Sequence, residues 1–444
     1  MKFMMSRYDY QSIQNLGLCI AFTNSELMSL TCSRKYSFEY VDCIKTEKFS
    51  YAMFFGTCWH YMCETVLLDI RQEDKIITYD QLDKILDTKV SQFIRDSLDE
   101  YEYIDKEEIF EKVYENINLG MYGWLDKWEK EIHPFYRVID VEKELIKPII
   151  HNGQPLKVRN KYIKEDFQDV SIIRNPLVGE LNKTYKSRSV ICGEYNTNNS
   201  VFSSVIEKEV PVYKVGKLDC ILLDRDTNSL WILDHKTSAN PVSYARKMQF
   251  DLQLYSYCSL LDYAINKGDY NFLGNVFIGG IIWDISSSKY NKPSFDKDGA
   301  LKQVKRGFIT YSLAKKILKE PKYEMVTDEY DEYLEILKNR DSSNYLVIKE
   351  LVSNRDIRRI NNEDVANSRK LISLRHDAYG LDGGNDVDID VKLPRYPVCL
   401  TYNFCAYETN CFQSDSFCNS SLIYLERRAK QYWIVSDLSR DLHK

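Results

Sequence analysis

The sequence predicts an α/β protein in which helices flank a central mixed β-sheet. Apolar residues recur at three- and four-residue spacing over 65–132 and 243–267, as expected for helices. Residues 224–228, Asp-Arg-Asp-Thr-Asn, are typical of a hairpin turn. Strand-like runs of alternating or continuous apolar residues lie at 138–146, 205–210, 215–223, 229–237 and 275–284.

The remaining segments carry weaker patterns. Residues 302–311 resemble one more strand, and residues 312–375 are rich in Lys, Glu and Leu, which favours helix. Residues 151–200 are polar and contain Asn-Gly, Asn-Pro and Asn-Asn pairs, so they predict an irregular excursion from the core. A loop is expected over 377–390.

Composition limits the classes of function. The 444 residues are 44% hydrophobic and carry a net charge of -6, which argues against a wholly basic protein that coats nucleic acid. No apolar run approaches the roughly 20 residues of a membrane helix, and residues 1–15 lack the apolar core of a signal peptide. We therefore expect a cytoplasmic protein without membrane contact. Its twelve cysteines would then be reduced, and clustered ones would indicate a metal rather than disulfides.

The predicted hairpin carries the residues that suggest chemistry. Asp219 closes a Gly-Lys-Leu-Asp run on the first strand, and Asp234 and Lys236 lie on the second. Residues 234 and 236 point to the same face of a strand and can reach one water or phosphate together. Mg²⁺ and Mn²⁺ prefer carboxylate and water oxygens. Two carboxylates and a lysine are thus the parts of a metal-dependent phosphodiesterase.

Two helical pairs accompany this hairpin. His60 and Glu64 are four residues apart and share a helix face, behind Gly56 and Thr57, which suit a helix start. Gln253 and Tyr257 have the same spacing in the helix after the hairpin. A single helical His is more often a packed core residue, and Asp-x-Lys is common by chance. The complete set is much harder to obtain by accident.

The order Gly56-Thr-x-x-His60-x-x-x-Glu64, Gly216-x-x-Asp219, Asp234-x-Lys236-Thr237, Gln253-x-x-x-Tyr257 resembles the RecB-like nucleases of the PD-(D/E)XK superfamily. It looks closest to phage exonucleases, the AddB nuclease domain and CRISPR-associated RecB-like exonucleases. The resemblance implies a restriction-endonuclease-like core that cuts single- or double-stranded DNA with Mg²⁺ or Mn²⁺.

The same resemblance implies a role for each matching residue. His60, Asp219, Asp234 and the backbone carbonyl of His235 would bind metal, and Lys236 would position or activate the attacking water. The side chains that would contact DNA or support the site are those of Gln253, Tyr257 and Glu64.

The cysteines add a second expectation. Cys399, Cys405 and Cys411 follow one another with five residues in each gap. Many members of the resembled family hold a [4Fe–4S] cluster through one N-terminal and three C-terminal cysteines, which implies Cys32 as the fourth ligand. Cys418 could replace one of the three. Zn²⁺ is the main alternative metal, and unliganded buried thiols are the remaining one.

We expect a single nuclease unit over 1–444. Its function is expected to be that of an exonuclease in DNA processing, recombination or replication, in the cytoplasm of a bacterium or a phage-infected host. The alternatives are an endonuclease of the same fold, or a DNA-binding structural subunit that works with a helicase or recombinase. The sequence contains no phosphate-binding loop of the G-x-x-x-x-G-K-S/T type, so we expect no motor activity in this chain.

The expected segments are an N-terminal segment with the first cysteine and the motif His (16–64), a helical insertion (65–135), the catalytic core (136–270), further core strands and helices (271–390) and the cysteine cluster (391–420).

Overall fold

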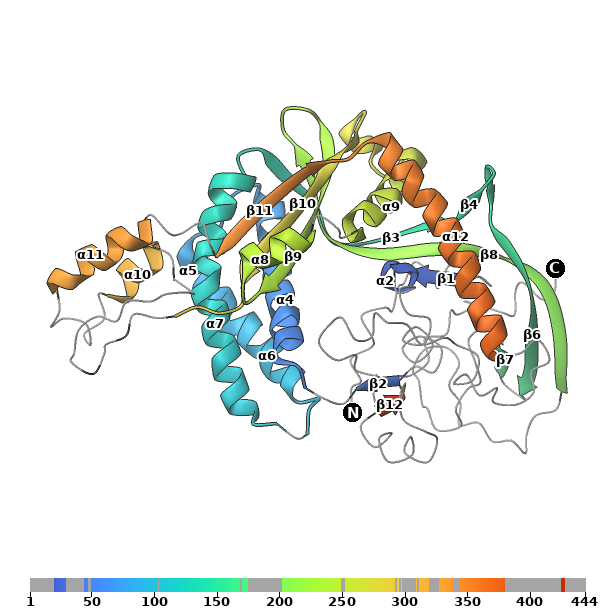
Figure 1. Ribbon diagram of the computed structural model, residues 1–444, viewed down its shortest axis with the longest axis horizontal. Coiled ribbons are helices and arrows are strands. Elements are labelled where there is room, and N and C mark those ends of the chain that lie inside the picture. The colour runs from blue at the N-terminus through green and yellow to red at the C-terminus, as the bar shows by residue number, and fades with distance from the viewer. Residues whose placement is uncertain are drawn as a thin grey trace. The chain divides into compact units, whose positions relative to one another are not determined.

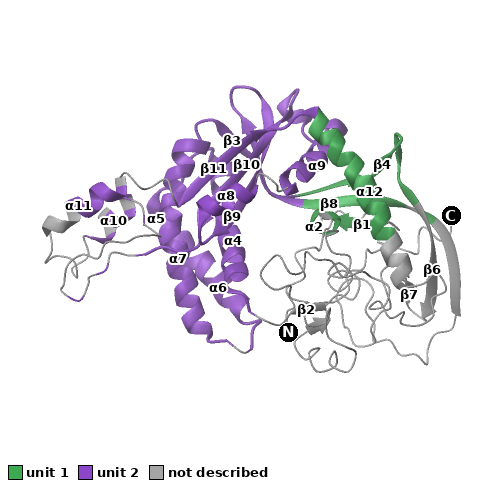
Figure 2. Cartoon of the chain, in the orientation of Figure 1, with its two compact units in different colours: residues 1–48, 144–216, 355–444 green, residues 49–143, 217–354 purple. Residues whose placement is uncertain are grey.

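The computed structural model describes residues 20–28, 44–46, 49–102, 104–167, 170–174, 202–248, 252–291, 294, 297, 309, 311–318, 327–338, 344–379 and 425–427. The chain divides into two compact units, coloured separately in Figure 2. Unit 1 comprises residues 1–48, 144–216 and 355–444, and unit 2 comprises residues 49–143 and 217–354. Asp219, Asp234 and Lys236 of the hairpin and the residues of the two helical pairs belong to unit 2, whereas Gly216 is the last residue of a unit 1 segment.

Unit 2 is built on a mixed sheet. Its neighbouring strands are β11 (Tyr345–Leu351), β10 (Phe277–Ser287), β9 (Ser229–Ser238) and the last part of β8 (Phe202–Asp224). β10 runs parallel to β9, whereas β11 and β8 are antiparallel to their neighbours. The predicted α/β fold with a mixed central sheet is therefore confirmed (Figure 1).

Helices cover this sheet. α4 (Tyr51–Glu73) packs against β9, and α7 (Lys106–Lys127) packs against β10 and β11. α9 (Gln253–Lys267) packs against β9 and β10. The helical pattern predicted over 65–132 is confirmed, because α4 and α7 are joined through further helical segments. The joining segments are α5 (Tyr79–Ile85), η3 (Leu86–Val90) and α6 (Ser91–Leu98). The helical segment η4 (Trp128–Ile132) follows α7.

Alternation along the strands separates two faces of the sheet. Trp231, Leu233 and Ile282 are buried in one cluster with the aromatic side chains of α4 and α7, such as Trp59 and Trp124. Because neighbouring strand residues point to opposite faces, the residues between them face away from this cluster. This alternation places consecutive residues of the predicted Asp-His-Lys motif on different sides of the sheet.

Unit 1 contains the first part of β8. β6 (Lys157–Phe167) pairs with it and with β7 (Val170–Arg174), both antiparallel, and β1 (Ile20–Thr23) pairs with it in parallel. The other elements of unit 1 are α2 (Asn24–Met28), the pairs β2 (Ile44–Thr46) with β12 (Leu425–Arg427) and β4 (Ile150–His151) with β5 (Gln154–Pro155), and α12 (Asn354–Tyr379). β3 (Tyr136–Pro148) begins in unit 2 and ends in unit 1.

Four sequence predictions are corrected. Residues 151–200 were expected to be irregular, yet β6 and β7 form there, because β6 pairs with β8 and β7 pairs with β6, which satisfies their backbone groups. β11 interrupts the helix expected over 312–375, since its Tyr345, Val347 and Ile348 favour a strand and it pairs with β10. The helix expected over 243–267 is two helices, α8 (Pro241–Met248) and α9. Tyr311 begins α10 (Tyr311–Ile317) instead of ending a strand, and α11 (Thr327–Lys338) follows.

Two buried lysines anchor α12 within unit 1. Lys214 on β8 is 0% exposed, and its Nζ lies 2.9 Å from Asp364 Oδ1. Lys147 on β3 lies with its Nζ 3.0 Å from Asp364 Oδ2 and also donates to Asn361 Oδ1 at 2.5 Å. Charges are buried at a large desolvation cost, which close pairing offsets. One carboxylate of α12 therefore holds the helix to two strands.

The substitution Asp364→Ala should destabilise the protein by about 3–5 kcal/mol, because it removes the carboxylate that both buried ammonium groups contact. The neighbouring Glu363 is a matched control, since its side chain is 43% exposed and pairs only at 4.0 Å with Arg359 among the described residues. Glu363→Ala should change stability by no more than about 0.5 kcal/mol. Urea unfolding followed by circular dichroism measures both, and equal effects would contradict the anchoring role.

Candidate active site

The predicted acids Asp219 and Asp234 lie directly after the last backbone pair of the β8–β9 hairpin, on the side away from its turn. The antiparallel register of the two strands runs from Leu223 opposite Leu230 to Cys220 opposite Leu233. Beyond this last pair, the backbone amide of His235 donates to Oδ2 of Asp219 at 2.9 Å. A side-chain carboxylate therefore bridges the two strands at the end of the hairpin.

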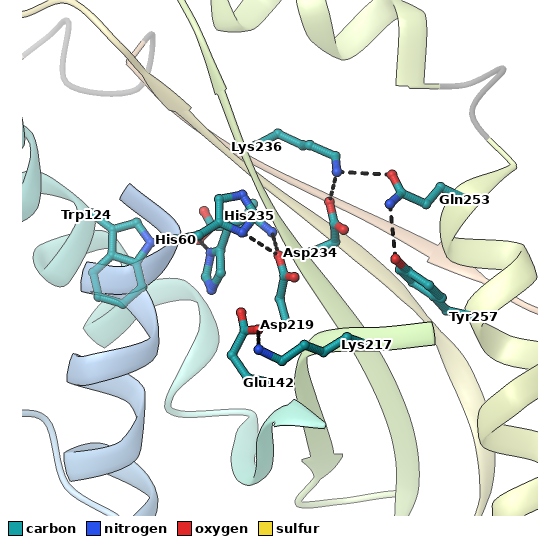
Figure 3. A network of polar contacts seen from close by, with 11 residues as sticks. His60, Trp124, Glu142, Lys217, Asp219, Asp234, His235, Lys236, Gln253 and Tyr257 are labelled. Atoms are coloured by element: carbon teal, nitrogen blue, oxygen red, sulfur yellow. Dashed lines mark hydrogen bonds and ion pairs between the residues drawn. The ribbon is translucent and has the colours of Figure 1, made fainter. Parts of the chain in front are cut away.

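His60 approaches the same carboxylate from α4. Its Nδ1 lies 3.2 Å from Asp219 Oδ2 (Figure 3). One turn earlier, a Cβ atom at Gly56 would lie 3.4 Å from Thr237 Oγ1, so the glycine permits a close approach of α4 to β9. The expectation that Gly56 and Thr57 begin the helix is wrong. The helix begins at Tyr51, because the Ser50 side chain caps it by accepting from the amide of Met53.

Glu142 is a candidate ligand that the sequence analysis missed. One donor atom each from His60, Glu142 and Asp219 lie within 4.8 Å of one another. Glu142 lies on β3 with φ of 50°, a left-handed conformation that is uncommon outside glycine. An imidazole with two carboxylates fits a divalent cation that prefers oxygen ligands. In the sequence, Glu142 was one of several acids in an alternating strand, and its spacing gave no signal.

Asp234 and Lys236 lie beside this group and face α9. The Nζ of Lys236 is 2.5 Å from Asp234 Oδ2 and donates to Gln253 Oε1 at 3.1 Å. The Nε2 of Gln253 donates to the hydroxyl of Tyr257 at 3.2 Å (Figure 3). The hairpin motif and the helical pair predicted from the sequence thus meet in one polar chain. Asp234 was predicted as a metal ligand, whereas its closest cation in the described chain is Lys236.

The two aspartates differ in their electrostatics. Burial disfavours the charge of Asp219, but His60, His235 and Lys236 outweigh it and hold its pKa well below the usual range. Burial raises the pKa of Asp234 despite the opposing charge of Lys236. Burial also works against the charge of Lys236, yet Asp234 and Asp219 outweigh it and raise the pKa of the lysine. Lys236 therefore stays protonated at neutral pH.

His60 and Glu64 have shifted pKa values as well. Burial opposes the charged form of His60, but the adjacent Asp219 outweighs it and raises the pKa of the imidazole. Burial raises the pKa of Glu64, and the charge of Glu142 adds to this effect. Glu64 lies one turn beyond His60 on α4 but outside the group of three donor atoms. Its predicted supporting role stays a prediction.

The predicted cluster ligands Cys32, Cys399, Cys405 and Cys411, together with Cys418, lie outside the described residues. In the described chain, Cys58, Cys63, Cys220 and Cys258 are buried and form no disulfide. Such burial is typical of cysteines that serve as small packing residues.

A carboxylate-rich donor group beside an aspartate–lysine pair, at the end of a mixed sheet, is typical of metal-dependent phosphodiester hydrolases. The sequence model of the PD-(D/E)XK nuclease superfamily matches residues 28–366, and the chain belongs to this family. Family membership implies a nucleic acid substrate. No curated protein matches the chain. Among the described helices, none combines the length and apolar character that crossing a membrane requires.

Glu142→Gln should weaken Mn²⁺ binding by about tenfold or more, because it removes a charged donor from the group of three. Glu64→Gln is the matched comparison, since Glu64 is a nearby acid that does not belong to the group of three donor atoms. Electron paramagnetic resonance of free Mn²⁺ measures both affinities, and thermal melting verifies folding. If Glu64→Gln weakened Mn²⁺ binding as much as Glu142→Gln, Glu142 would not be the distinctive ligand.

Proposed function

We propose that this protein is a Mg²⁺- or Mn²⁺-dependent deoxyribonuclease that acts as an exonuclease. The observation that carries the proposal is the Asp234–Lys236 ion pair held beside the donor group of His60, Glu142 and Asp219. The choice of DNA and of an exonuclease rests on the resemblance to RecB-like nucleases. The setting in which we expect it to work is the cytoplasm of a bacterial or phage-infected cell, with a helicase or recombinase as a candidate partner.

The candidate metal ligands are three side chains that the structure brings together and two further groups that the resemblance implies. His60, Glu142 and Asp219 would hold a divalent ion, and Asp234 and the carbonyl of His235 are further candidate contacts. A bound ion of this kind lowers the pKa of water, polarises the phosphate and stabilises the leaving oxygen. The low pKa of Asp219 supports its role as a ligand, because that carboxylate stays ionised and available for binding.

Lys236 has a separate task. Its raised pKa keeps it protonated, so it is suited to donate hydrogen bonds that orient the attacking water and a phosphoryl oxygen. A lysine that serves as a base needs a lowered pKa. Asp234 and Gln253 fix the ammonium group in place. The water would attack phosphorus in line while the bond from phosphorus to the 3′-oxygen breaks; the attacking water would lose a proton to the solvent, and the leaving 3′-oxygen would gain one.

Asp234→Asn should lower DNA cleavage by about 10²-fold or more, because it removes the charge that fixes Lys236. Asp226→Asn is the control, since Asp226 is an exposed residue in the turn of the same hairpin and should leave cleavage unchanged. End-labelled linear DNA and covalently closed circles, single- and double-stranded, serve as substrates with Mg²⁺ or Mn²⁺.

Each outcome of this assay has a clear meaning. An exonuclease degrades linear DNA and leaves closed circles intact, whereas cleavage of circles would indicate an endonuclease. Full activity of the Asp234→Asn variant would refute the catalytic assignment. A wild-type protein that binds DNA but cuts none of these substrates would favour the structural-subunit alternative.

We propose in addition that Cys32, Cys399, Cys405 and Cys411 hold a [4Fe–4S] cluster, as the RecB-like and AddB-like resemblance implies. Four thiolates on one cluster would tie the N-terminal segment to the C-terminal segment. Zn²⁺ in the same four thiolates is the alternative, because Cys₄ sites suit it as well.

Protein purified without oxygen should be brown, with an absorbance band at about 400 nm. Cys405→Ser should remove the colour and the iron, because one cluster ligand is lost. Cys258→Ser should retain both, since Cys258 is a buried thiol of α9. Iron analysis and absorbance spectra measure the result, and colourless protein loaded with zinc would contradict the iron–sulfur assignment.

A further inference from the structure

Asp284 joins two buried groups beneath the active site. It lies on β10 and is 2% exposed. Its Oδ2 accepts a hydrogen bond from Nε1 of Trp124 on α7 at 2.6 Å. The same oxygen lies 2.8 Å from Nδ1 of His235. One carboxylate oxygen of Asp284 therefore contacts both the indole of Trp124 and the imidazole of His235.

Asp284 is the polar contact that orients the ring of His235. The ring lies among aromatic neighbours, with centroids 6.0 Å from Trp124, 6.2 Å from Trp128 and 6.0 Å from His60. Nε2 of His235 is buried and has no hydrogen-bond partner in the part of the chain that the structure describes. The aromatic neighbours restrict the tilt of the ring, and the contact of Nδ1 with Asp284 adds the polar contact that fixes which edge of the ring faces β10.

The residue that carries this ring also contacts the metal-binding group, through its backbone amide. The amide of His235 donates to Oδ2 of Asp219, which is also the oxygen that contacts His60 (Figure 3). In the parallel register of β9 and β10, Asp284 lies directly beside His235. Hydrogen bonds thus join Trp124 to Asp284 and Asp284 to the ring of His235, and the covalent structure of His235 links that ring to the amide that donates to Asp219. Asp284 and Trp124 touch no atom of the donor group themselves.

We propose that Asp284 and Trp124 are positioning residues for the metal centre. Through the imidazole of His235 they fix the peptide whose amide holds Asp219, and thereby the ligand geometry. This inference rests on the proposed function, which supplies the metal that Asp219 would bind. Partners that orient the ligands of a metal site typically contribute 10–100-fold in metal affinity or activity.

A matched pair of tryptophan substitutions tests the proposal. Trp124→Phe deletes the indole N–H that donates to Asp284. Trp231→Phe deletes the same group from a buried tryptophan near the start of β9, where Nε1 donates to Ser229 Oγ at 3.1 Å. Both changes remove one indole hydrogen bond from the same buried cluster. Asp284→Asn is a third variant that keeps the side-chain size and removes the charge.

The expected results separate positioning from general stability. Trp124→Phe and Asp284→Asn should raise the Mn²⁺ dissociation constant, measured by electron paramagnetic resonance, by about tenfold or more. Their KM for DNA should be unchanged, and excess Mn²⁺ should restore much of the lost kcat. Trp231→Phe should bind Mn²⁺ like the wild type. Thermal melting reports whether each variant is folded at the temperature of the assay.

Two outcomes would overturn the inference. One is folded Trp124→Phe protein that binds Mn²⁺ with wild-type affinity. The other is an equal loss of affinity in Trp231→Phe, which would show a general effect of core packing. Both outcomes leave the proposed function intact if the wild type binds Mn²⁺ and cuts DNA. Wild-type protein that does neither would instead refute the proposed function together with the inference.

Discussion

The hydrogen bond from the amide of His235 to the carboxylate of Asp219 is the contact on which the site depends. Up to Cys220 and Leu233, backbone pairing holds β8 and β9 together. At the next step a side-chain oxygen accepts from the strand, at 2.9 Å. A buried amide must find an acceptor, and a charged acceptor strengthens the bond. One interaction therefore completes the end of the hairpin and holds a carboxylate within reach of His60.

Side chains alternate between the two faces of β9, so its consecutive residues Asp234, His235 and Lys236 have different partners. Asp234 and Lys236 face α9, where Gln253 and Tyr257 continue the polar chain. His235 faces the opposite side, where Asp284 holds its ring. Asp234 is buried, and Lys236 offsets only part of the energetic cost of its charge, so the pKa of the acid is raised beside a lysine that stays charged.

The sequence predicts the parts of the site that depend on local spacing. Asp234 with Lys236 follows the two-residue period of a strand, and Gln253 with Tyr257 follows the helical turn. Asp284 has no such signal, because only the parallel register of β10 with β9 brings it to His235. β11 differs, since its Tyr345, Val347 and Ile348 favour a strand locally, but they lie within a segment rich in Lys, Glu and Leu, and only the pairing with β10 fixes their place in the sheet.

Glu142 shows why the last ligand could not be predicted, and how the fold holds it. A non-glycine residue with positive φ costs about 1–3 kcal/mol and persists only where its surroundings determine it. Here Lys217 contacts the Glu142 carboxylate at 2.5 Å. Two residues earlier, Asp140 is held by Arg71 at 3.1 Å and by Tyr270 at 3.2 Å. Contacts of Asp140 and of Glu142 itself thus hold β3 at the strained residue, and they keep the carboxylate of Glu142 near His60 and Asp219.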